Sequence, residues 1–244
     1  MNEPEPAIVL GIPGKWKDRS EIVTSIARLS GGYLFAGRVL LHVASGTSFE
    51  LEIYDHDPSL AEKVRSGGMG QIPEEDLTAV EEHTFTLYLL SNETGRDVVE
   101  RMMDAVVGLL SAGGLVVKVD NAGFAVAACR WREHAAVKAA YSLYRSMVTL
   151  VGNEEEHFTC GMRALSLPDC AVITGDLEEA FDVATEFCCY LMDEAPKIAD
   201  GHTFGVAEGA KRYRLSFENY TYYSPDHAFH NPKGLWRLGP VEGD

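Results

Sequence analysis

The sequence predicts an α+β fold, in which mixed or antiparallel sheets have helices packed on one face. Short apolar or alternating segments, which are typical of strands, recur along the chain. Between them lie segments whose apolar residues follow a helical spacing, and glycine pairs end two of these. The composition, 46% hydrophobic and 24% charged over 244 residues, is that of a globular protein.

The first elements are predicted to be a strand, a turn and a helix. Residues 7–12 form a continuous apolar run, which is typical of a buried strand. Pro13 and Gly14 break this run. Asp18, with Glu21 three residues later, resembles a capping box at the start of a helix. The helix has an apolar stripe, formed by Ile22, Val23, Ile26 and Leu29, and the glycine pair that follows is expected to end it.

The rest of the first half adds strands around one clear helix. An apolar stripe predicts a helix over residues 94–111, and a buried strand is expected at 115–119. Residues 66–73 are rich in glycine and polar residues and predict a loop. The remaining strands are expected at residues 33–43, 49–54 and 84–90. The resulting order resembles a ferredoxin-like βαββαβ unit with an additional strand.

The second half repeats this mixture. A helix is expected at residues 129–146, and a second one begins at the capping pattern of Asp176 and Glu179. Strands are expected at residues 147–151, 158–162, 170–173 and 213–217. The patterns therefore predict two α+β units, residues 1–121 and 122–244. These units are either two related halves or parts of one continuous domain.

The charge balance indicates which partners to expect. Lysine and arginine number 21 and aspartate and glutamate 37, so the formal charge is −16. Nucleic acids and anionic membranes attract cationic surfaces, so neither is expected as a partner. A basic protein fits this charge better. No stretch approaches the length of apolar sequence that a membrane helix needs.

The cysteines indicate a reducing compartment. There are five of them, an odd number, and no CxxC pattern occurs. The first residues lack the basic and apolar regions of a secretory signal. We therefore expect a cytoplasmic protein whose cysteines serve mostly as small buried apolar groups.

Lys15 and Trp16 are candidate ligand-binding residues because they follow a predicted strand and turn, where phosphate-binding loops occur. The phosphate-loop pattern fails, however, at Trp16 and at Val9. The alternative is a tight turn in which Trp16 covers an edge of the core.

Two other polar clusters favour structural roles. Asp57 precedes Pro58, which is typical of a helix cap, whereas alternation along a strand separates His56 from its acidic neighbours. His157 and Cys160 have a spacing that metal sites use, but no further ligands stand out, so Cys160 is predicted to be buried.

The best candidates for catalysis are Asp226, His227 and His230, with His202 in a second polar turn. Histidine titrates near neutrality and can act as a general base. The alternative is that these residues occupy ordinary loops. No complete catalytic motif of the common hydrolase or protease types occurs, and the sequence predicts no metal site and no cofactor.

Two groups of motifs resemble a known family. One is the segment from Gly11 to Lys17, which contains Pro13-Gly14-Lys15-Trp16 (PGxW). The other is Gly161-Met162 followed by Leu167-Pro168-Asp169 (GM…LPD). Together they resemble a bacterial family known only as a domain of unknown function. The resemblance implies a bacterial cytoplasmic protein and carries no catalytic residue.

Three functional hypotheses follow. The first is a binding or accessory protein, immunity-like or regulatory, whose acidic surface steers a basic partner. The second is a small-molecule or metal-assisted hydrolase that uses Asp226, His227 and His230. The third is a self-assembling protein in which an exposed strand edge pairs two copies.

Overall fold

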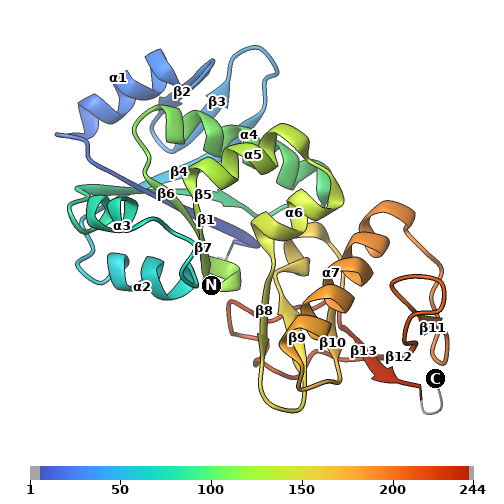
Figure 1. Cartoon of the computed structure of the whole chain (residues 1–244). Helices are drawn as coiled ribbons and strands as arrows, with labels where there is room; N and C mark the ends of the chain where they lie inside the picture. Colours follow the sequence, from blue (N-terminus) through green and yellow to red (C-terminus); the bar gives the residue numbers. More distant parts are fainter. Residues whose placement is uncertain (1–5, 242–244) are drawn as a thin grey trace. The chain divides into compact units, whose positions relative to one another are not determined.

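The computed structural model describes residues 6–241, which form two compact units that divide after Val137 (Figure 1). Sequence patterning placed the division near Asn121. In the structure Asn121 lies in a 3-10 turn between strands β6 (Val116–Val119) and β7 (Phe124–Ala127). Because β7 pairs with β6, it remains in the first unit together with the helix that follows it.

The first unit is an antiparallel sheet with helices. Its elements in chain order are β1 (Ile8–Gly14), α1 (Arg19–Leu29), β2 (Tyr33–Ala36), β3 (Val39–His42), β4 (Ser48–Asp55), α2 (Leu60–Gly67), α3 (Glu74–Glu81), β5 (Phe85–Ser91), α4 (Arg96–Ser111), β6, β7 and α5 (Ala128–Val137). The seven strands lie in the order β2-β3-β4-β5-β1-β6-β7. The central strands β4, β5, β1 and β6 have the strand order of a ferredoxin-like unit, and the predicted α+β class is confirmed.

Local sequence explains where the first elements begin and end. The carboxylate of Asp18 accepts a 2.9 Å hydrogen bond from the backbone of Glu21, so the predicted cap of α1 is present. The segment 33–43, expected as one strand, is the hairpin of β2 and β3. It turns at Gly37, whose φ is +62°, a conformation that glycine adopts without strain.

Helices cover both faces of the sheet at the β6–β7 end. Leu10 of β1 pairs with Val119 of β6, so these two buried side chains lie on the same face of the sheet. On that side α4 and α5 lie side by side (Figure 1). Val116 and Ala125, which lie on the opposite face, pack with buried residues of α2 and α3. The predicted loop at 66–73 lies between two short helices, α2 and α3. Helices were expected on one face of the sheet only, and these two form a second layer on the other face.

The second unit holds a separate sheet. Its elements are α6 (Ala140–Met147), β8 (Thr149–Gly152), β9 (His157–Cys160), a 3-10 turn (Met162–Leu165), β10 (Asp169–Val172), α7 (Leu177–Glu194), β11 (Thr203–Phe204), β12 (Tyr213–Glu218) and β13 (Leu235–Pro240). The strand order is β11-β12-β13-β10-β9-β8, in which β10 and β13 run parallel. This order differs from that of the first sheet, so strand order gives no support to a duplication.

Two helices replace the single helix expected at 129–146. Lys138, between α5 and α6, has a φ of +53°, which a continuing helix cannot accommodate. Further along, Asp176 caps α7 as predicted by accepting hydrogen bonds from the backbones of Glu178 and Glu179. Within the described residues, no helix is both long and apolar enough to span a membrane.

Candidate functional site

Trp16, a predicted ligand-binding residue, is buried at the turn after β1. Its indole N–H donates a 2.8 Å hydrogen bond to the carbonyl oxygen of Ala112, and its ring fills the space beside Gly14. Lys15 lies at the surface and pairs with Glu82 at 2.6 Å. The structure thus gives Trp16 a packing role, and a ligand-binding role for Lys15 and Trp16 stays a prediction.

The predicted cluster of Asp226, His227 and His230 lies in the loop between β12 and β13, on an aromatic surface. The ring of His227 stacks on Tyr223 with centroids 4.5 Å apart, and its Nδ1 accepts a 3.1 Å hydrogen bond from the backbone of Phe229. Nδ1 of His230 lies 3.1 Å from the carbonyl oxygen of Tyr223. Among the residues that the structure describes, no three histidine, cysteine or acidic side chains are grouped to hold a metal ion.

His202 is exposed in a turn before β11. Its Nδ1 lies 3.4 Å from the backbone nitrogen of Ala199, and its carbonyl oxygen accepts a 2.8 Å hydrogen bond from the backbone of Leu215. These contacts hold the turn. A hydrolase built on these histidines therefore stays a prediction.

The polar cluster at the end of β4 lies in the first unit. Nδ1 of His56 is 2.7 Å from the carbonyl oxygen of His83, and the two imidazole rings have centroids 4.4 Å apart. Asp57 accepts hydrogen bonds from the backbone and the hydroxyl of Ser59, just before α2 begins. These hydrogen bonds hold the pKa of Asp57 well below its usual range. The carboxylate therefore supports the turn before α2. The helix cap predicted at Asp57 is wrong, because α2 begins after Ser59, two residues later.

Asp169, at the start of β10, is an acid with no exposed surface in the interior of the second unit. Its Oδ1 accepts hydrogen bonds from the hydroxyl of Thr159 at 2.8 Å and the backbone N–H of Met162 at 3.3 Å. Its Oδ2 accepts a 2.7 Å hydrogen bond from the side-chain amide of Asn231. Burial raises the pKa of Asp169 to about 7, although the hydrogen bonds from Asn231 and Thr159 oppose that rise. One carboxyl group thus joins β9, the turn after it, β10 and the loop before β13.

An aromatic segment, residues 220–229, packs beside this network. The ring of Tyr222 stacks on Phe158 with centroids 3.7 Å apart, and the Tyr220 hydroxyl lies 3.4 Å from the sulfur of Cys160. Cys160 is fully buried, as predicted, and burial raises its pKa to about 12. Its thiol is therefore protonated at neutral pH and serves packing.

Sequence reasoning did not single out Asp169 and Asn231 as a pair. Asp169 closes the GM…LPD motif, and Asn231 stands between His230 and Pro232. Two sequence features could have drawn attention to these residues: Asp169 is an acid at the start of an apolar strand, and Asn231 is an amide beside a proline. Spacing alone could not connect the two, because 62 residues separate them.

The first unit has a sheet face that is partly uncovered, which we call the open face. Leu34 pairs with Leu41, and Ala36 pairs with Val39, so these four side chains of β2 and β3 lie on one face. Leu34, Val39 and Leu41 are 47%, 50% and 38% exposed. The alternate residues of the same strands, such as Leu40, are buried on the other face.

Charged residues border the open face. Arg38, in the turn between β2 and β3, forms ion pairs with Glu50 and Glu52 of β4. The hydroxyl of Tyr54 donates a 3.0 Å hydrogen bond to Glu52. Val39 pairs directly with Glu50 across the strands, so the apolar and charged parts are continuous. This arrangement can take up an apolar surface of another molecule and orient it by charge.

The fold and these two regions define an α+β protein with a ferredoxin-like first unit and a second unit centred on Asp169. Residues 158–237 match the model of a family described as a domain of unknown function (DUF4261). The matched stretch contains the Asp169 network and the GM…LPD motif, whereas PGxW lies outside it. The same comparisons found no significant match among curated proteins or solved structures.

Proposed function

We propose that this chain is a cytoplasmic binding protein, of an accessory or regulatory kind, whose partner is a basic protein. The observation that carries the proposal is the open face, where apolar side chains of one sheet remain exposed. Their burial against a partner would contribute on the order of 1 kcal/mol for each half-exposed side chain. Single exposed apolar residues are ordinary, but Leu34, Val39 and Leu41 are contiguous on adjacent strands.

Charge selects the kind of partner. At a formal charge of −16, the chain attracts a basic protein over distances comparable to the screening length and raises the rate of encounter. The partner we propose is therefore a protein of net positive charge that presents an apolar patch. Charge supplies the steering, and apolar contact with the open face supplies most of the affinity.

A second copy of the chain fits less well. Two copies repel each other, because each carries a formal charge of −16. The edge strand β2 is also partly occupied, since the hydroxyl of Ser30 accepts a 3.0 Å hydrogen bond from the N–H of Tyr33 and donates a 3.2 Å bond to its carbonyl oxygen. These groups are then less available to a pairing strand.

The test is affinity capture with two matched variants. Val39→Lys places a cation on the open face opposite Glu50, which preserves the strand through a cross-strand ion pair. Val23→Lys changes a comparably exposed valine on α1, 41% against 50% exposed. We expect the wild type and Val23→Lys to capture the same basic protein, and Val39→Lys to lose it. Equal capture by all three proteins would refute the proposal.

A further inference from the structure

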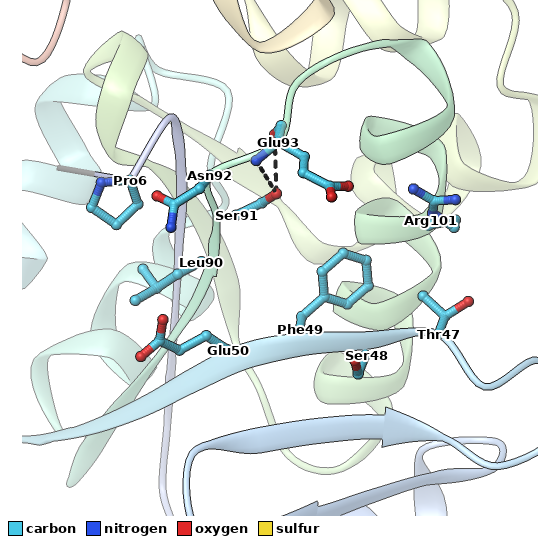
Figure 2. A pocket seen from close by; sticks show the side chains of 10 residues that line it. All are labelled: Pro6, Thr47, Ser48, Phe49, Glu50, Leu90, Ser91, Asn92, Glu93 and Arg101. Carbon is cyan, nitrogen blue, oxygen red and sulfur yellow. Dashed lines mark hydrogen bonds between the residues drawn. The ribbon is translucent and has the colours of Figure 1, made fainter. Parts of the chain in front are cut away.

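A hollow of about 380 Å³ lies where β4 begins and β5 ends, in the first unit (Figure 2). Its lining includes the ring of Phe49, the amide of Asn92 and three charged residues, Glu50, Glu93 and Arg101. Glu50 is already paired with Arg38, so Glu93 and Arg101 are the two opposite charges left to face a ligand. A second hollow of about 540 Å³ adjoins it, because Thr47 and Arg101 line both. This volume suits a small metabolite.

The opposite charges in this hollow are held apart. Figure 2 shows the carboxylate of Glu93 and the guanidinium of Arg101 above the ring of Phe49 and turned toward one another. In the part of the chain that the structure describes, they form no ion pair with each other. Arg101 instead contacts Asp97, one turn earlier on α4, at 3.4 Å. A ligand carboxylate would therefore share the guanidinium of Arg101 with Asp97, while the carboxylate of Glu93 faces the same hollow.

The backbone that carries each of these two side chains is anchored, whereas the side chains themselves are exposed. The hydroxyl of Ser91 accepts a 3.1 Å hydrogen bond from the N–H of Glu93 and donates a 3.0 Å bond to its carbonyl oxygen, which sets the backbone after β5 (Figure 2). Arg101 projects from α4, whose neighbouring residues Val98 and Met102 are buried. Such anchoring lowers the entropy that binding must remove.

We propose that this hollow binds a free α-amino acid as its zwitterion. The carboxylate would pair with the guanidinium of Arg101, the ammonium group with the carboxylate of Glu93, and the apolar part would lie against Phe49. The adjoining hollow would receive a larger side chain. This ligand is separate from the basic protein proposed above, and its binding is measured on the chain alone.

The test is ligand-observed NMR of the wild-type chain with the twenty common L-amino acids, each at about 10 mM, a range that detects weak binding. For each amino acid that binds, the matched amine without the carboxylate and the matched acid without the ammonium group are tested as well. We expect at least one amino acid to bind, and both one-charge analogues to bind about tenfold more weakly or not at all.

Variants then locate the site. Arg101→Gln and Glu93→Gln should each weaken binding about tenfold, whereas Arg130→Gln and Glu62→Gln, which change exposed charges elsewhere in the unit, should not. Thermal unfolding checks that every variant is folded. The proposal is overturned if no amino acid binds the wild type, if a one-charge analogue binds equally well, or if folded Arg101→Gln and Glu93→Gln bind normally.

Discussion

The side-chain amide of Asn231 donates a 2.7 Å hydrogen bond to the buried carboxylate of Asp169, although the two residues are 62 positions apart in the chain. This bond ties the loop before β13 to the start of β10. Both residues lie within the stretch that matches the domain of unknown function. The contribution of the Asn231–Asp169 hydrogen bond to stability can be measured directly.

We predict that Asn231→Ala destabilises the protein by about 1–3 kcal/mol, because the buried carboxylate then loses a donor. Urea unfolding gives the free energy. The control is Asn219→Ala, which changes an exposed asparagine and should have little effect. Equal unfolding free energies for the wild type and Asn231→Ala would contradict this role.

Asp169 should also make stability depend on pH. Burial raises its pKa from 3.8 to about 7, so between these values the folded chain holds a proton that the unfolded chain releases. This contribution to stability is therefore largest at low pH and is lost as pH rises through about 7. From about pH 5 to about pH 8 we expect its loss to lower the free energy of unfolding by about 2–3 kcal/mol. The free energy of unfolding of the wild type should fall over this pH range, whereas that of Asp169→Asn should not show this fall. Parallel pH profiles of the two proteins would contradict the role given to Asp169.

Close packing at the first turn gives a third prediction. A Cβ at Gly14 would lie 2.3 Å from the ring of Trp16, so Gly14→Ala should lower the free energy of unfolding by about 1–3 kcal/mol. Gly239 has open space at the same position, and Gly239→Ala is the matched control. Thermal unfolding compares the two. Similar melting temperatures would show that Trp16 moves without cost.

The cysteines should differ sharply in reactivity. Cys160, Cys170 and Cys188 are buried, as expected for most of the cysteines, but Cys129 is exposed. Cys189 is half-buried, and burial raises its pKa to about 11. With an aromatic disulfide reagent at neutral pH, we expect one fast thiol in the folded protein, absent in Cys129→Ser, and the remaining thiols only after denaturation. Fast reaction of the Cys129→Ser protein would contradict the burial described.

Local sequence was enough to predict the first strand and the helix caps at Asp18 and Asp176, but not the turn that divides the segment 33–43 into two strands. Asp18 and Asp176 begin helices where their patterns indicate, because a cap depends on residues two or three positions away. Patterns did not predict the break at Lys138, where a residue with good helix propensity adopts a positive φ. They also missed the Asp169–Asn231 contact, because it depends on the tertiary fold.

The most direct test of the proposed function is the affinity of the captured basic partner for the Val39→Lys and Val23→Lys variants, measured at physiological salt. We predict that Val39→Lys weakens binding about tenfold or more, that Val23→Lys leaves it unchanged, and that added salt slows association of the wild type. Equal affinities for the two variants would show that the open face is not where the partner binds.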